Sequence, residues 1–270
     1  MNQLRRFTLS SALLALAVLA GCAAPTPAPS AAVDQQVRQA LAPTGPLRVG
    51  VYPGSPTSMV MDAKTGEKVG VALNLGRELA RQLGVPFEAV EFKRVVEVVD
   101  ALKVGAVDFT FTNASPARAK EVDFTAPLID LELGYLVPPG STMQSAADAD
   151  RAGMRIGVAQ GSTSQGTLSR EYKQAKLVPV ASLQVAAELL KQGQLDAFAT
   201  NKAILNEMWD GLPGFRILEG RWGLEHLAVA VPKGREAGLP FLNQFAQEAK
   251  TNGLLQSIID KSGLRGAAKP

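Results

Sequence analysis

Cysteine and histidine are almost absent from this sequence, which has one of each in 270 residues. A single cysteine excludes an internal disulfide, and one histidine without a second thiol leaves no ligand set for a Cys/His zinc site. We therefore expect no metal site and no cofactor. The net charge is only +3 and the basic residues are scattered, so no nucleic-acid partner is expected either.

Long apolar runs are also scarce. The clearest run, from Phe7 to Leu19, follows a positively charged start and is too short to span a bilayer comfortably. We assign residues 1–21 to an export signal, since the run ends in a Leu-Ala-Gly-Cys sequence that resembles the lipobox of bacterial lipoproteins. Cys22 is then the predicted lipid attachment site. Residues 22–44 are rich in Ala, Pro, Ser and Thr and are predicted to form a disordered tether.

Three short motifs occur twice in the remaining sequence, in the same order. The paired motifs are Arg48-Val49-Gly50-Val51 with Arg155-Ile156-Gly157-Val158, Lys103-x-Gly105-x-x-Asp108 with Lys191-x-Gly193-x-x-Asp196, and Thr112-Asn113 with Thr200-Asn201. In each half, apolar residues at helical spacing precede a short β-rich run. The alternation of helix and strand predicts two α/β units with parallel strand pairing.

Each of the later strands ends in Thr-Asn. Ligands of open α/β sheets bind beyond the carboxyl ends of the strands, so Thr112, Asn113, Thr200 and Asn201 are predicted to lie at a binding site. Asn201 has a second explanation of equal weight, because asparagine is a favourable N-cap for the helix that follows. Asp108 and Asp196 follow helix-ending glycines and are expected to accept hydrogen bonds from turn N–H groups.

Further helix and strand signals complete the plan. Helices are predicted over residues 71–83, 95–104, 183–192, 241–250 and 254–261, after Ser115-Pro116, and after Gly161-Ser162-Thr163. The small residues before that last helix leave backbone N–H groups open to an anion. Two apolar runs, residues 133–137 and 227–231, are predicted to cross between the halves as a hinge. The last two helices should return to the first half.

These motifs resemble the family-3 extracellular solute-binding proteins, the polar amino-acid-binding class that serves ABC importers. The resemblance covers about Leu47 to Leu264 and is most specific over residues 113–120 and 122–127. It implies a type II periplasmic-binding-protein fold, with residues 45–137 plus 228–266 as lobe 1 and residues 138–227 as lobe 2. It also implies a monomer whose partners are a small carboxylate or amino-acid-like solute, a membrane permease and, through the N-terminal lipid, the membrane.

By the same resemblance, Arg118 is the clamp for the ligand's carboxylate, with further donors at Asn113 and at Gly161, Ser162 and Thr163. A guanidinium binds a carboxylate through two parallel charge-assisted hydrogen bonds. Tyr52 and Asn201 occupy positions where amino-acid binders of the family carry acids, and Ser55 replaces a stacking aromatic residue. A buried ammonium without a carboxylate partner is costly, so this pattern predicts a carboxylate ligand that lacks a free α-amine.

Two other functions stay open at this point. The two-lobed fold also hosts dehydratases that act on cyclic carboxylic acids, but an enzyme needs a positioned acid or base, and none is predicted in the cleft. A sensory role is the other alternative, although no signalling domain follows in this sequence. His226 is expected to be structural or to face the hinge, and we expect a binding protein without catalytic residues.

Overall fold

The computed structural model describes residues 33–268. The predicted export signal and Cys22 lie outside these residues. The helices are α1 (Gln35–Leu41), α2 (Val71–Leu83), α3 (Val95–Lys103), α4 (Pro116–Ala119), α5 (Thr163–Glu171), α6 (Leu183–Lys191), α7 (Lys202–Asp210), α8 (Leu239–Thr251) and α9 (Leu254–Lys261), with single 3-10 turns at Ala146–Asp148 and Glu236–Gly238. The strands are β1 (Leu47–Val51), β2 (Val60–Met61), β3 (Lys68–Val69), β4 (Phe87–Glu91), β5 (Thr110–Asn113), β6 (Val122–Phe124), β7 (Ile129–Val137), β8 (Arg155–Ala159), β9 (Lys176–Val180), β10 (Ala197–Asn201), β11 (Arg216–Ile217) and β12 (Gly223–Pro232).

The predicted helices are confirmed to within a few residues. Helix α2 has the predicted bounds, and α3 and α6 each end one residue earlier than predicted. Residues next to the helix ends explain where these helices begin and end. Gly105 and Gly193 have φ values of 68° and 64°, a left-handed conformation that glycine adopts without a steric penalty. Ser162 and Ser182 accept hydrogen bonds from backbone N–H groups in the first turns of α5 and α6.

Strands β7 and β12 form the hinge and join the two lobes into one mixed sheet. They pair antiparallel from Ile129 opposite Leu227 to Leu133 opposite Gly223. Beyond this shared segment, β12 pairs with β5 and β6 in the first lobe, whereas β7 pairs with β10 in the second. The chain is therefore the expected two-lobed α/β fold. Because β7 and β12 run unbroken through the hinge, the exact lobe boundaries stay a prediction.

Parallel pairing holds among the longer strands within each lobe but not at the hinge, and the short strands β2 and β3 pair antiparallel. Strand β8 pairs parallel with β9 and β10, and β1 pairs parallel with β4. Strand β5 pairs antiparallel with β12, although a parallel bridge joins Val49 to Phe109 just before β5. The prediction of parallel pairing is thus right for the longer strands of the lobes, and every antiparallel pair except β2–β3 includes a crossing strand.

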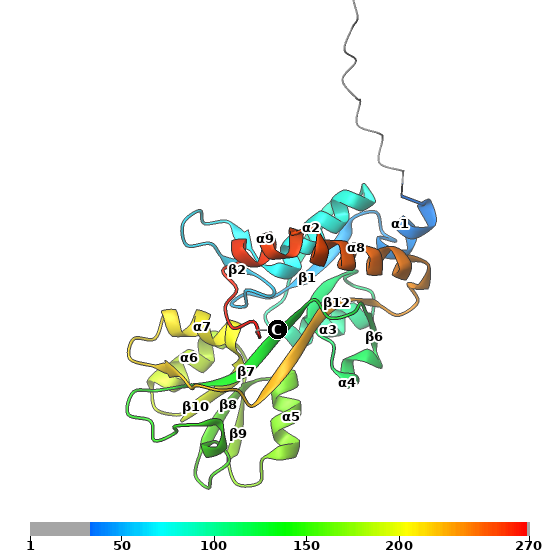
Figure 1. Ribbon diagram of the computed structural model, residues 1–270. Coiled ribbons are helices and arrows are strands. Elements are labelled where there is room, and N and C mark those ends of the chain that lie inside the picture. The colour runs from blue at the N-terminus through cyan, green and yellow to red at the C-terminus, as the bar shows by residue number, and fades with distance from the viewer. Residues whose placement is uncertain (1–32, 269–270) are drawn as a thin grey trace, which may run out of the picture. The chain divides into compact units, whose positions relative to one another are not determined.

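The last two helices pack on the first lobe, as predicted. Phe245 of α8 and Leu255 and Ile258 of α9 share one buried core with Leu75 and Leu79 of α2. Figure 1 shows α9 beside α2. Within residues 33–268, no helix has both the length and the apolar character to cross a membrane.

The prediction of a disordered tether is wrong for its final residues. Helix α1 lies within residues 22–44, and the Asp34 side chain caps it by accepting from the backbone N–H of Gln36. Leu41 at its end is only 1% exposed and belongs to the core of the first lobe. Burial of one leucine contributes about 1.5–3 kcal/mol, which offsets the low hydrophobicity of the segment.

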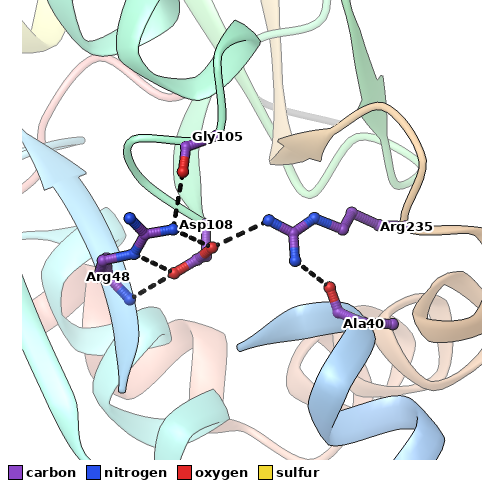
Figure 2. A network of polar contacts seen from close by, with 5 residues as sticks. All are labelled: Ala40, Arg48, Gly105, Asp108 and Arg235. Atoms are coloured by element: carbon purple, nitrogen blue, oxygen red, sulfur yellow. Dashed lines mark hydrogen bonds and ion pairs between the residues drawn. The ribbon is translucent and has the colours of Figure 1, made fainter. Parts of the chain in front are cut away.

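The repeated motifs form the same ion pair in each lobe (Figure 2 shows the first). The Asp108 carboxylate accepts from the backbone N–H of Arg48 at 3.1 Å and from Nε at 2.8 Å, and Arg48 Nη2 also donates to the carbonyl oxygen of Gly105 at 2.7 Å. In the second lobe Arg155 makes the corresponding bonds to Asp196 at 2.7 and 3.0 Å and to the Gly193 carbonyl at 2.7 Å. The expectation that the aspartates serve turn N–H groups is therefore wrong. Each aspartate joins the first strand of its lobe, β1 or β8, to the loop that follows α3 or α6.

The two ion pairs differ in burial. The Asp108 side chain is 0% exposed and receives a second guanidinium from Arg235 at 3.1 Å, whereas the Asp196 side chain is 30% exposed. Arg235 also donates to the carbonyl oxygen of Ala40, so the first network holds α1 against the lobe (Figure 2). Removing a buried carboxylate that has two cationic partners should therefore cost more folding stability than removing a carboxylate from a partly exposed ion pair.

Candidate functional site

The main pocket lies between the lobes and holds about 730 Å³, counting the part open to solvent. It is bounded by the carboxyl ends of β5, β8 and β10, by the loop after β1, and by the hinge strand β12. Thr112, Asn113, Thr200 and Asn201 all line it. The Thr-Asn motifs that lie eighty-eight residues apart in the sequence therefore meet at one site. Strand topology places them there, because β5 and β10 flank the two hinge strands in the same sheet.

Arg118 lies on the pocket side of α4. Ser115 caps this helix by accepting from the backbone N–H of Arg118, and Pro116 occupies the first turn. The guanidinium donates from Nη1 to Thr112 Oγ1 at 2.6 Å and to the Asn113 carbonyl at 3.5 Å. Arg118 forms no ion pair with any residue between 33 and 268. Burial lowers its pKa, and the negative charge of Glu225 opposes that shift.

Glu225 is the acidic residue of the pocket, and the sequence analysis did not assign it to the site. It lies on β12 and is 7% exposed. Oε1 accepts from Thr163 Oγ1 at 2.6 Å, and Oε2 accepts from Asn201 Nδ2 at 2.9 Å. No described lysine, arginine or histidine pairs with it. The prediction of a pocket without an acid is therefore wrong.

The sequence analysis missed Glu225 because it placed the start of the hinge strand too late in the chain. The predicted crossing began at Leu227, but β12 begins at Gly223, so Glu225 lies inside the strand, two residues before the buried Leu227. A charged residue within an apolar strand is almost never fully buried unless something pairs with it. That pattern was readable in the sequence only once the strand had its full length.

Asn201 performs the capping role and also faces the pocket. Its Oδ1 accepts from the backbone N–H of Ile204 at 3.1 Å, while Nδ2 donates to Glu225. Asn113 is connected to the same group, because its Nδ2 donates to Thr163 Oγ1 at 3.3 Å. A chain of hydrogen bonds therefore runs from the first lobe through Thr163 to Glu225.

Two predicted ligand contacts are not where the sequence analysis put them. Ser55 is 0% exposed and absent from the pocket lining, because its hydroxyl faces inward and pairs with Thr57 Oγ1 at 2.8 Å. Gly161 also does not line the main pocket, and its N–H already donates to Gln165 Oε1 at 2.7 Å. Tyr52, Ser162 and Thr163 do line it. Burial raises the pKa of the Tyr52 hydroxyl, while hydrogen bonding to Ser55 acts in the opposite direction.

The lobes touch each other at the rim of the pocket. Arg94 Nη1 donates to Gln160 Oε1 at 2.8 Å across the cleft. Gly161 packs on Val96 so closely that a Cβ at this glycine would lie 2.6 Å from Val96 Cβ. The lobes are therefore in a closed arrangement, in which a glycine is required at the contact.

His226, the one histidine of the sequence, lies outside the main pocket. It lies on β12 with Nδ1 2.7 Å from Asp130 Oδ1 on the partner hinge strand. Across residues 33–268, no group of three or more His, Cys, Asp or Glu residues is arranged to hold a metal ion. The charged groups that line the pocket are thus the guanidiniums of Arg94 and Arg118, the ammonium of Lys93 and the carboxylate of Glu225, and several amide and hydroxyl groups accompany them.

Comparison with known proteins agrees with this geometry. Residues 47–264 match the family described as bacterial extracellular solute-binding proteins, family 3. The chain is 25% identical to the ABC transporter glutamine-binding protein of Bacillus subtilis, over 73% of each chain. It is 26% identical to the ABC transporter arginine-binding protein 1 of Escherichia coli, over 72% of this chain and 82% of the relative.

Solved structures show the same fold. A mutant ArgBP from T. maritima matches with a TM-score of 0.75 and 25% identity, over 84% of this chain and 99% of that one. The solute receptor for L-cysteine of Neisseria gonorrhoeae matches with a TM-score of 0.74 and 25% identity, over 84% and 92%. The ligands named for these similar proteins differ, so the names alone do not select a ligand.

Proposed function

Because this chain belongs to the bacterial extracellular solute-binding proteins of family 3, we propose that it captures an α-amino acid between its lobes for an ABC importer. In this proposal Arg118 binds the α-carboxylate and Glu225 binds the α-ammonium. The relatives named as glutamine-binding and arginine-binding proteins support the choice of an amino acid.

One observation carries the proposal. The pocket contains a partly buried cation, Arg118, and a buried anion, Glu225, and neither has a counter-ion among residues 33–268. Arg118 pays a desolvation penalty that lowers its pKa, and Glu225 is satisfied only by a hydroxyl and an amide. Buried charges are normally paired. A zwitterion supplies the two missing partners at once, whereas an amine-free acid would leave Glu225 unpaired.

The neighbouring groups fit the same pose. Thr112 and Asn113 hold the guanidinium through the hydrogen bonds described above, and Thr163 and Asn201 hold the carboxylate. We propose that Tyr52 and Ser162 complete the contacts to the ligand. A site whose charged groups are positioned by surrounding hydrogen bonds needs less ordering when the ligand binds.

The direct test is a thermal-shift screen of α-amino acids beside matched acids that lack the amine. A ligand at one hundred times its Kd adds about 2.7 kcal/mol of stability. For a protein of this size, each kcal/mol raises Tm by about 2–4 °C. Stabilisation is expected from an amino acid and not from its amine-free analogue. Stabilisation by amine-free acids alone would contradict the role of Glu225.

Replacing Glu225 with glutamine should weaken amino-acid binding about 10- to 150-fold. A hydrogen bond to a charged group contributes about 1.5–3 kcal/mol, and the amide keeps the size of the side chain while it removes the charge. Isothermal titration calorimetry measures the change in Kd. Glu219→Gln is the matched control, because Glu219 is exposed and outside the pocket. Equal affinities for the wild type and Glu225→Gln would reject the ammonium site.

Replacing Gly161 with alanine should weaken binding about 5- to 150-fold without altering any ligand contact. The new Cβ would clash with Val96 only when the lobes are closed, and overpacking of this kind costs about 1–3 kcal/mol. Gly193→Ala is the control. Gly193 is also left-handed, with a φ of 64°, but nothing lies within 4 Å of a Cβ there. The two variants should therefore share the backbone penalty, and only Gly161→Ala should change Kd. Identical Kd values would show that the closed contact does not form.

Export and lipid attachment at Cys22 belong to the proposal as well. The description of the family as extracellular supports export, and the lipobox-like sequence supports the lipid. We propose a monomer anchored on the outer side of a bacterial membrane, with a membrane permease as its partner. Cys22→Ser should release the protein from the membrane fraction, and retention of this variant would argue against the anchor.

Glu225 also gives the enzymatic alternative its one supporting observation, because it is a positioned carboxylate in the cleft. The relatives of this chain are binding proteins, and a solved structure with the same fold is an ancestral amino acid-binding protein described as a precursor of cyclohexadienyl dehydratase. We propose binding without turnover. NMR of the bound amino acid during prolonged incubation should show an unchanged ligand, and any product would favour the enzyme.

A further inference from the structure

The pocket is more positive than a zwitterion requires. Lys93 and Arg94, in the loop before α3, line it together with Arg118, whereas Glu225 is the one acid among its lining residues. Arg94 is partly neutralised, since its Nε lies 2.8 Å from Glu97 Oε1. Lys93 is exposed, and its ammonium forms no ion pair with any described residue. After an α-carboxylate and an α-ammonium are bound, one cation is left over.

The backbone adds to this positive potential. Val95, Thr163 and Leu183 line the pocket and are the first residues of α3, α5 and α6, and Asn201 is the N-cap of α7. Each of these helices has at least eight residues and points its N-terminus at the same space. Helix N-termini carry a partial positive charge and favour anions. No lining residue other than Glu225 offsets them with a negative charge.

The second opening of the cleft has the same character. It is lined by Lys120, Arg170 and His226 beside Arg118, and no aspartate or glutamate lines it. A cleft lined by charges of one sign attracts ligands of the opposite sign and raises their association rate. The mouth and the interior therefore both favour a ligand with net negative charge.

We propose that the pocket selects an amino acid with a carboxylate in its side chain, and that Lys93 is the residue that recognises this second carboxylate. The proposal rests on the function proposed above. Glu225 is already occupied by the α-ammonium, so a cationic side chain would enter the pocket without an acidic partner. Leaving such a charge unpaired is costly. The chain therefore differs in specificity from its arginine-binding relatives.

Calorimetry with the full-length protein and four ligands tests the proposal: L-glutamate, L-aspartate, L-glutamine and L-arginine. An acidic amino acid should bind at least about 10-fold more tightly than glutamine, and arginine should not bind detectably, since charge-assisted hydrogen bonds are about twice as strong as neutral ones. In Lys93→Gln the ratio of acidic to amide affinity should fall about 10-fold. Lys176→Gln is the control with the same charge change, because Lys176 is exposed on β9 and outside the pocket.

The outcomes separate the two proposals. If glutamine or arginine binds best, the acidic specificity is wrong while amino-acid capture stands. If an acidic amino acid binds best but Lys93→Gln leaves the affinity ratio unchanged, the role assigned to Lys93 is wrong. If none of a full set of amino acids binds, the proposed function itself fails, and this inference fails with it. A drop in the ratio for Lys176→Gln as large as that for Lys93→Gln would point to net charge and overturn the role of Lys93.

Discussion

Arg118→Ala is expected to weaken amino-acid binding by at least about 100-fold, while the ligand-free protein keeps its stability. Truncating one partner of a buried, hydrogen-bonded charge pair costs about 2–5 kcal/mol. Among residues 33–268, the guanidinium donates hydrogen bonds to Thr112 Oγ1 and the Asn113 carbonyl, and neither bond belongs to an apolar core. Burial already disfavours its charge, as its lowered pKa indicates. Removing it therefore relieves a desolvation penalty instead of breaking a stabilising ion pair.

Calorimetry and thermal unfolding check the two halves of this prediction. Arg118→Lys is a useful companion, because lysine keeps the charge but loses the planar fork that binds two carboxylate oxygens. It should bind with an affinity between those of the wild type and Arg118→Ala. An unchanged Kd in the alanine variant would remove Arg118 from the site, and a large loss of Tm would show that its role is structural.

Asp108→Asn should destabilise the protein by about 3–5 kcal/mol, whereas Asp196→Asn should cost about 1 kcal/mol. Breaking a buried ion pair leaves a buried charge without compensation, and Asp108 has two guanidinium partners, Arg48 and Arg235. The corresponding pair in the second lobe, Arg155 with Asp196, is partly exposed, and pairs near the surface contribute about 0–1 kcal/mol. The same motif thus has different effects because its surroundings differ.

Urea denaturation of the two variants provides the comparison, with a larger drop in midpoint expected for Asp108→Asn. The pH dependence supplies a second check. Hydrogen bonds and charge from Arg155 hold the pKa of Asp196 below its usual range. Its contribution is therefore fully present above the unfolded pKa of about 3.9 and is lost as the pH falls through the lower folded pKa. The Asp196→Asn variant should therefore lose less folding stability than the wild type as the pH falls through this range. Equal midpoints for the two variants would contradict the role assigned to burial.

Much of the fold was predictable from short stretches of sequence. Apolar spacing gives the bounds of α2, and side chains near each helix end account for the rest. These features are the ends of α3 and α6 at glycine and the caps at Ser115, Ser162 and Ser182. The repeated motifs indicated two similar halves. The Thr-Asn pairs were predicted at the site because ligands of open α/β sheets bind beyond the carboxyl ends of the strands. In the structure β5 and β10 run in opposite directions, and their carboxyl ends meet at the hinge strands.

Several of the errors arose because a deciding partner lies far along the chain. Helix α1 was missed because its stability comes from packing and from Arg235, 195 residues away from Ala40. Gly161 was read as a ligand donor, although its own neighbour Gln165 uses its N–H and Val96 of the other lobe covers its Cα. Ser55 faces inward to Thr57. The contact of Arg235 with Ala40 and that of Val96 with Gly161 join residues far apart in the sequence, so local spacing could not reveal them.

The sequence by itself determined the family, the order of helices and strands, and the position of Arg118, because these depend on local periodicity, capping and a continuous motif. Only the tertiary structure decided what completes the pocket. Glu225 meets Thr163 across 62 residues and Asn201 across 24 residues, and the hinge strand brings all three together. Whether a buried charge has a partner is a property of three-dimensional packing, so the place of Glu225 in the pocket became visible only in the tertiary structure.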